Sequence, residues 1–171
     1  EICPESFAHP AKVSRALIRH IYEHAFAEGW LRAGDVCCDP FGGIAGTALD
    51  AMWSGLHWIG CELEPRFVGL AQQNLDLWRR KYGSKPGFGS ARILQGDSRN
   101  LAQIVASADL VCSSPPFHQS GVTDHAGQTN ALIGKFKGGG DKFLSNYSYG
   151  DTEGQLGAMK EGEAPSVDLM V

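Results

Sequence analysis

A short apolar run that ends in an acid and opens into a glycine-rich turn constrains this chain more than any other stretch. Residues 36–38 are apolar, Asp39 follows them, and the turn contains Gly42, Gly43 and Gly46. Such a run fits a buried parallel strand, and the glycines let the backbone turn tightly and approach a ligand. The spacing is neither G-x-G-x-x-G nor G-x-x-x-x-G-K-[ST], so neither a dinucleotide site nor a P-loop is indicated. On its own the turn fits a ligand-free strand-to-helix connection equally well.

Strand and helix signals alternate along the chain up to Ser114. We expect strands at 36–38, 57–64, 91–95 and 109–113, and helices at 13–25, 47–53, 65–82 and 101–105. This alternation implies right-handed crossovers and a parallel sheet, so the predicted fold class is α/β. In the first helix an apolar stripe recurs every four residues and is expected to face the core: Val13, Leu17, Ile21 and Ala25.

A polar residue stands at or just past the end of each expected strand: Asp39, Glu62, Asp97 and Ser114. Ligands of parallel sheets bind at the carboxyl ends of the strands, where the strand order reverses. Glu62 lies 23 residues after Asp39, close to the spacing at which an acid accepts two hydrogen bonds from a ribose diol. Asp97 can accept from an exocyclic amine such as that of adenine. The alternatives are a solvated acid before the next helix for Glu62 and a turn or cap residue for Asp97.

The segment Ser114-Pro115-Pro116-Phe117 is the most specific signal in the chain. Two consecutive prolines remove two backbone donors and stiffen the chain, which leaves carbonyl acceptors outside any strand ladder. A rigid edge of acceptors followed by an aromatic ring suits a planar base that carries an amino group. A strand that merely ends in a double proline is the alternative.

Composition narrows the class of protein. A chain of 171 residues that is 43% hydrophobic and 20% charged fits one globular domain with a sizeable core. The five cysteines are an odd number and form no C-x-x-C pair, which favours reduced thiols in an intracellular protein and no metal site. No run of 18 apolar residues occurs, so neither a membrane span nor a signal peptide is predicted. A net charge of −4 gives no general attraction to nucleic acid.

The last third of the chain differs from the rest. Ten of the 22 glycines fall between His118 and Val171, and apolar periodicity fades there. Such a composition buries too little apolar surface to order itself. We therefore expect a core at residues 1–117 and a glycine-rich, flexible region at 118–171.

Four stretches resemble motifs of the S-adenosylmethionine-dependent DNA amino-methyltransferases. Residues 39–47 resemble their D-P-F-x-G-x-G-T loop, and residues 114–117 match their [DNS]-P-P-[YFW] catalytic motif. His9-Pro10-Ala11-Lys12 looks like the N-terminal cofactor motif, and Gly60-Cys61-Glu62 looks like the ribose-binding strand end. With Gly43 on the first glycine of the loop, Ala45 stands where the second is expected.

The resemblance implies a Rossmann-like class I methyltransferase fold with strand order 3-2-1-4. It also implies transfer of a methyl group from S-adenosylmethionine to cytosine N4 or adenine N6 of a base flipped out of DNA, as in restriction-modification enzymes of bacteria or phages. The family's sheet has seven strands and this chain shows four, so an incomplete sheet is expected. The implied catalytic residues are Ser114, Pro115, Pro116 and Phe117, and the implied cofactor residues are Phe7, His9, Lys12, Asp39, Pro40, Phe41, Gly42, Gly43, Gly46, Thr47, Glu62 and Asp97.

Three alternative functions remain open at this point. Related loops serve in methylation of RNA bases and of protein glutamine, and a cofactor-binding or DNA-binding fragment without turnover is also compatible with the sequence. Methylation of cytosine at carbon 5 is disfavoured, because that reaction needs a Pro-Cys nucleophile, which the chain lacks.

Overall fold

The computed structural model describes residues 2–9, 13–116 and 152–155. The chain divides into two compact units, Glu1–Ser6 with Lys12–Pro115 and Phe7–Ala11 with Pro116–Val171. The first unit contains the sheet and the helices that pack on it. In the second unit, residues 152–155 form a turn in which the Gln155 amide donates to the Thr152 carbonyl at 3.0 Å. The region predicted to be flexible, 118–171, lies outside the described residues apart from this turn.

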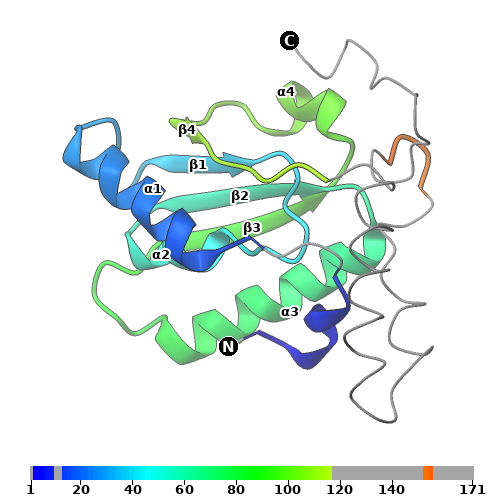
Figure 1. Ribbon diagram of the computed structural model, residues 1–171, viewed down its shortest axis with the longest axis horizontal. Helices are drawn as coiled ribbons and strands as arrows, with labels where there is room; N and C mark the ends of the chain where they lie inside the picture. Colours follow the sequence, from blue (N-terminus) through cyan, green and yellow to red (C-terminus); the bar gives the residue numbers. More distant parts are fainter. Residues whose placement is uncertain (1, 10–12, 117–151, 156–171) are drawn as a thin grey trace, which may run out of the picture. The chain divides into compact units, whose positions relative to one another are not determined.

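Four parallel strands form the sheet, in the order β3-β2-β1-β4 (Figure 1). The strands are β1 (Val36–Asp39), β2 (His57–Glu62), β3 (Ser90–Gln95) and β4 (Leu110–Val111). The predicted α/β class and the predicted strand order are therefore confirmed. Strand β4 is shorter than the expected 109–113 and pairs with β1 only through Leu110 and Val111.

The helices fall close to the predicted positions. They are α1 (Arg15–Ala27), α2 (Ala48–Trp53), α3 (Pro65–Tyr82) and α4 (Leu101–Ile104), with short 3-10 turns η1 (Pro4–Ala8) and η2 (Ser98–Asn100). Helix α3 has the expected bounds, because Pro65 suits the first helical position and three basic residues in the last turn favour the helix carboxyl end. Among the helices that the structure describes, none is long and apolar enough to cross a membrane.

The apolar stripe predicted for the first helix is correct at Ala25, which is buried, and at Val13, which packs partly buried against the core, but it is wrong at Leu17 and Ile21. Ile18, Tyr22 and Ala25 are buried, whereas Leu17 is 56% and Ile21 is 36% exposed. The buried residues follow the helical period of 3.6, whereas the predicted stripe used a period of four, which drifts around the helix. Leu17 and Ile21 therefore lie toward solvent.

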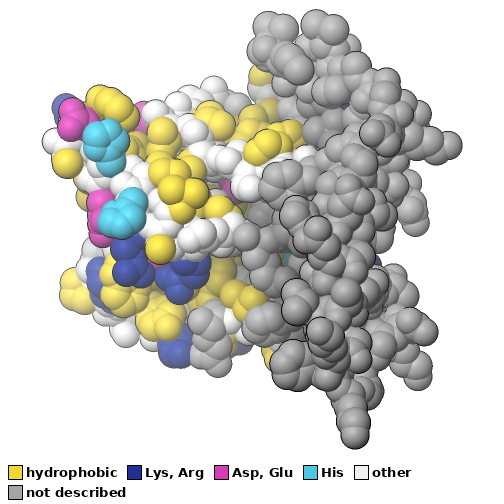
Figure 2. Space-filling view, in the orientation of Figure 1, with side chains coloured by type: hydrophobic (Ala, Val, Ile, Leu, Met, Phe, Trp, Pro, Cys, Tyr) yellow, Lys and Arg dark blue, Asp and Glu magenta, His cyan; other side chains and the backbone are white. Residues whose placement is uncertain are grey.

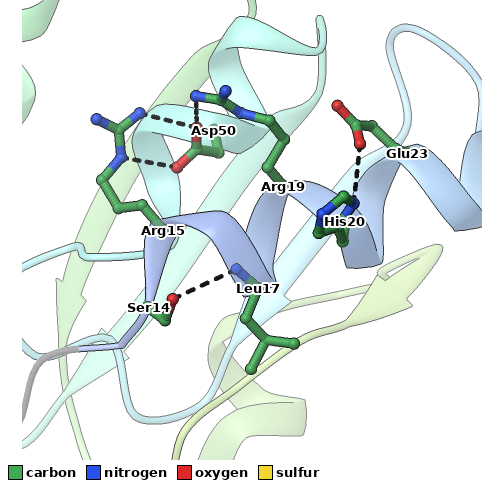
Figure 3. Close-up of polar contacts among 7 residues, drawn as sticks. All are labelled: Ser14, Arg15, Leu17, Arg19, His20, Glu23 and Asp50. Atoms are coloured by element: carbon green, nitrogen blue, oxygen red, sulfur yellow. Dashed lines mark hydrogen bonds and ion pairs between the residues drawn. The ribbon is translucent and has the colours of Figure 1, made fainter.

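An ion pair also joins α1 to α2 (Figure 3). The Arg15 guanidinium donates to both oxygens of Asp50, at 2.9 and 2.8 Å, and Arg19 lies 3.5 Å from the same carboxylate. The Asp50 side chain is only 4% exposed, so it needs these partners to offset its lost hydration. The face over α1 shows Lys and Arg side chains next to hydrophobic ones (Figure 2).

Two apolar clusters cover the two faces of the sheet. Alternate strand residues such as Cys37 and Trp58 pack with α1, α2 and α3 in the larger cluster. Their neighbours Cys38 and Ile59 pack with Val105 in the smaller one. Because successive strand residues point to opposite faces, both sides of the sheet are buried, as in α/β folds.

Candidate active site

The strand order brings the predicted polar residues of three strands to one edge of the sheet. Asp39 ends β1, Glu62 ends β2, and Ser114 follows the end of β4. Strand β1 lies between β2 and β4, so these three strand ends are neighbours (Figure 1). Asp97 follows β3, at the far end of the strand order.

Asp39 is buried, and its two carboxylate oxygens accept three hydrogen bonds. One oxygen accepts from the Ser113 hydroxyl at 2.6 Å and from the Phe41 amide at 3.1 Å. The other accepts from the Thr47 hydroxyl at 2.8 Å, and Thr47 in turn accepts from the Trp58 indole at 2.9 Å. Burial raises the pKa of Asp39, and the bonds from Ser113, Thr47 and Phe41 lower it. These contacts tie both ends of the glycine turn to the end of β1.

Glu62 is the second buried acid at this edge. Its Oε2 accepts from the Gly43 amide at 2.9 Å, and its Oε1 accepts from the Glu64 amide at 2.8 Å. Burial raises the pKa of Glu62, while the hydrogen bonds from the backbone amides of Glu64 and Gly43 lower it. Each carboxylate oxygen has two acceptor sites, so these bonds leave Glu62 able to accept from a diol as well.

The glycine turn is fixed against β2 by close backbone contacts. The Gly42 amide donates to the Cys61 carbonyl at 2.7 Å. A Cβ on Gly42 would lie 2.8 Å from Ile93 Cδ1 and 3.2 Å from Gly60 Cα, so a larger residue would push the turn away from β2. Pro40, Phe41 and Gly46 are half-buried in the same turn.

Ala45 has a backbone conformation that glycine favours. Its φ is 65°, which makes it the one residue other than glycine with positive φ in the described part of the chain. This is the position at which the resembling family has its second glycine. An L-residue in the left-handed region costs about 1 kcal/mol, so the turn holds Ala45 in a strained conformation.

Asp97 differs from the two buried acids. It caps η2 by accepting from the Arg99 amide at 2.9 Å, and its carboxylate also pairs with the Arg99 guanidinium at 2.5 Å. Hydrogen bonding to Arg99 lowers the pKa of Asp97. Asp97 is therefore a cap residue, which is the alternative that the sequence left open, and its contact with the adenine amine stays a prediction.

The structure describes only some of the remaining predicted site residues, and it divides them between the two units. Ser114 and Pro115 are exposed beyond the end of β4. Pro116 is half-buried and belongs to the second unit, as do Phe7 and the buried His9. Lys12 and Phe117 lie outside the described residues, so their roles stay predictions.

Sequence reasoning missed two residues of this edge, Ser113 and Trp58. Both act through Asp39 or its partner Thr47, and neither belongs to the motif stretches that we identified in the sequence. A signal for Ser113 did exist, because it directly precedes the double-proline segment on a strand that neighbours Asp39. No local signal marked Trp58, which reaches Thr47 only after β2 is paired with β1.

Comparison with known proteins supports the resemblance. Residues 4–73 match a family described as DNA methylase, of the N6/N4 type, which agrees with the amino-methyltransferase motifs. The tRNA (guanine(10)-N2)-dimethyltransferase of Methanothermobacter thermautotrophicus is 25% identical over 117 residues. That match covers 68% of this chain and 31% of the relative, so the chain spans about a third of the length of this curated relative.

Solved structures with a similar arrangement include two methyltransferases. The C-terminal domain of precorrin-6Y C5,15-methyltransferase from Rhodobacter capsulatus is 21% identical with a TM-score of 0.48, over 73% of this chain and 62% of that one. Magnesium protoporphyrin IX methyltransferase from Synechocystis PCC 6803, solved with bound SAH, is 16% identical with a TM-score of 0.42, over 71% of this chain and 57% of that one.

Proposed function

We propose that this chain forms the cofactor-binding and catalytic core of an S-adenosylmethionine-dependent methyltransferase that modifies an exocyclic amine of a DNA base, cytosine N4 or adenine N6. One observation carries the proposal. The glycine turn after β1 and the Ser114-Pro115 segment after β4 leave adjacent strands at the same edge. The match of residues 4–73 to DNA methylases supports it.

The residues at the ends of β1 and β2 fit the proposed cofactor. S-adenosylmethionine supplies an electrophilic methyl group when it is bound. Glu62 accepts the hydrogen bonds of the ribose diol through the acceptor sites that Gly43 and Glu64 leave open. The turn of residues 42–46 holds the cofactor by its backbone, and Asp97 accepts from the adenine amine while it shares its carboxylate with Arg99.

Ser114 and Pro115 act on the amine of the target base. The base must first leave the duplex, which costs a few kcal/mol. An exocyclic amine conjugated to its ring is a poor nucleophile, so two acceptors on its N–H bonds draw the nitrogen toward tetrahedral geometry. The Ser114 hydroxyl and the Pro115 carbonyl are these acceptors. No strong base is needed when the proton leaves after transfer, and positioning for in-line attack supplies much of the acceleration.

A base in RNA is the second candidate substrate. The curated relative is named for guanine N2 of a tRNA, and that nitrogen is also an exocyclic amine. The same pair of acceptors would serve either nucleic acid, because the chemistry at the amine is shared. The two candidates therefore differ in how the substrate is held and not in the transfer step.

Transfer of a labelled methyl group separates these candidates. We expect incorporation into DNA oligonucleotides that contain unmodified cytosine or adenine, and incorporation into tRNA alone would favour the second candidate. Ser114→Ala should lower the single-turnover rate while it spares cofactor affinity. Ser90→Ala is the matched control, since Ser90 is an exposed serine at the first position of β3. A wild-type rate for Ser114→Ala on every substrate would exclude the proposed role of Ser114.

A further inference from the structure

A hydrogen bond joins the two segments that the proposed reaction must bring together. The Ser113 hydroxyl donates to Asp39 Oδ1 at 2.6 Å, between residues 74 positions apart. Ser113 directly precedes Ser114 and Pro115, and Asp39 directly precedes the glycine turn. This bond therefore spans the gap between the catalytic and the cofactor segments.

The strand ladder ends just before this bond. The Cys112 amide donates to the Cys38 carbonyl at 3.0 Å, after which β4 and β1 exchange no further backbone hydrogen bond within the described residues. Pro115 has no backbone N–H, so it cannot extend the ladder. Beyond Cys112, the Ser113 side chain takes over from the ladder in fixing the segment that carries Ser114.

On its other side Asp39 holds the glycine turn. It accepts from the Phe41 amide at the start of the turn and from the Thr47 hydroxyl at its end. Because Ser113 and Phe41 share one oxygen and Thr47 uses the other, a single buried carboxylate links β4 to both ends of the turn. A carboxylate buried in this way fixes its donors more firmly than an exposed one, since water does not compete for them.

We propose that Ser113 is a positioning residue, which sets the place of Ser114 and Pro115 relative to the bound cofactor by donating to Asp39. The inference rests on the proposed function, because it assumes that Ser114 and Pro115 receive the target amine. Ser113 itself touches neither substrate nor cofactor. Its loss therefore lowers the rate of transfer and leaves cofactor binding in place.

Thr47 provides the matched comparison. Both hydroxyls donate to Asp39, but Thr47, directly before α2, joins the turn to the Trp58 indole of β2, whereas Ser113 joins the segment after β4 to Asp39. Thr47→Val should therefore weaken cofactor binding, whereas Ser113→Ala should leave the cofactor Kd within about threefold of wild type. Ser113→Ala should instead lower the single-turnover rate by about 10-fold to 100-fold, which is the range expected when a reacting group is misplaced by up to 1 Å. Ser113→Thr keeps the donor and should recover most of the rate.

The experiment measures single-turnover methyl transfer at saturating cofactor and the Kd of S-adenosylhomocysteine by calorimetry for these variants. If the alanine variant does not fold, Ser113→Cys replaces it, because cysteine is nearly isosteric with serine but a weak donor. It should likewise lower the single-turnover rate and leave the Kd unchanged. In an Asp39→Ala background, which has no acceptor for the Ser113 hydroxyl, Ser113→Ala should cost much less than in wild type, because the two side chains act through one bond.

The outcomes distinguish a failure of the role proposed for Ser113 from a failure of the proposed function. A wild-type rate for Ser113→Ala, an equal loss of rate and affinity, or independent effects in the Asp39→Ala background would overturn the role of Ser113 alone. A wild-type protein that binds no S-adenosylhomocysteine would instead refute the proposed function, and the role of Ser113 with it. Selective loss of rate with recovery by threonine establishes the positioning role.

Discussion

An acid stands at the end of β1, at the end of β2 and just past the end of β3, but the surroundings of the first two acids differ from those of the third. Asp39 and Glu62 are buried and accept hydrogen bonds from backbone amides, and Asp39 also accepts from side-chain hydroxyls. Asp97 is partly exposed and is paired with Arg99, two residues away. Position at a strand end is therefore not sufficient to make a buried acceptor. Asp39 and Glu62 end strands that have a neighbouring strand on each side, whereas β3 has a neighbour on one side only in the described sheet.

The largest difference between the buried acids and Asp97 should appear in the free energy of unfolding of variants that lack them. Asp39→Ala leaves the donors of Ser113, Thr47 and Phe41 without their acceptor in a buried site, which should lower the free energy of unfolding by about 3 kcal/mol. Asp97→Ala removes a surface ion pair and the cap of η2, and it should cost about 1 kcal/mol. Urea denaturation of both variants measures the two values, and equal losses would refute the contrast.

Cofactor affinity should separate the same regions. Glu62→Ala removes a buried charged acceptor and should weaken S-adenosylhomocysteine binding by about 1.5–3 kcal/mol, roughly 10-fold to 100-fold. Asp97→Ala should have a smaller effect, because its carboxylate is already bound by Arg99 and lies partly in water. The matched control is Asp76→Ala, which removes another exposed acid paired with a nearby arginine. Calorimetry in which Glu62→Ala binds as tightly as the control would exclude Glu62 from the ribose site.

The pH dependence of stability should have opposite signs at the two regions. Glu62 has a raised pKa in the folded protein, so its contribution is most favourable below the ordinary carboxyl value of about 4 and is lost as the pH rises through the raised value. Asp97 has a lowered pKa, so its contribution is present above about 4 and is lost as the pH falls through the lowered value.

Urea unfolding of two conservative variants at several pH values measures how the free energy of unfolding depends on pH at each carboxylate. The free energy of unfolding of Glu62→Gln relative to wild type should increase as the pH rises. That of Asp97→Asn relative to wild type should increase as the pH falls. The same slope in both variants would show that the two carboxylates have similar surroundings.

The smallest effect is expected in the glycine turn itself. Ala45→Gly relieves the left-handed strain but loses a buried methyl group and adds flexibility to the unfolded chain. These contributions nearly cancel, so the free energy of unfolding should change by less than about 1 kcal/mol. A loss of several kcal/mol in thermal or urea unfolding would mean that the alanine methyl is essential to the turn.

The parts of the fold that the sequence predicted are those determined by local pattern and motif order. The positions of the strands and the acids at their ends belong to this group, because short apolar runs and turn residues mark them directly, whereas the strand order was implied by the family resemblance. The prediction for α1 failed at Leu17 and Ile21 because it used a period of four instead of 3.6, and no local pattern relates Arg15 to its partner Asp50 on the next helix. The bond from Ser113 to Asp39 could not be predicted either, because strand pairing alone brings these two residues together. The ion pair of Asp97 with Arg99 depends on the side-chain rotamer of Arg99, which the sequence does not specify.

The central claim is that the cofactor binds at the ends of β1 and β2, against Glu62. Backbone amide NMR of the isotope-labelled protein, titrated with S-adenosylhomocysteine, tests this most directly, because the Gly43 and Glu64 amides donate to Glu62 and report on any new partner of its carboxylate. We expect saturable shifts at Gly43 and Glu64 in wild type, and in Glu62→Ala the shift at Gly43 should require roughly 10-fold to 100-fold more ligand. Saturating ligand that leaves both amides unchanged, or that shifts only amides of other regions, would contradict the claim.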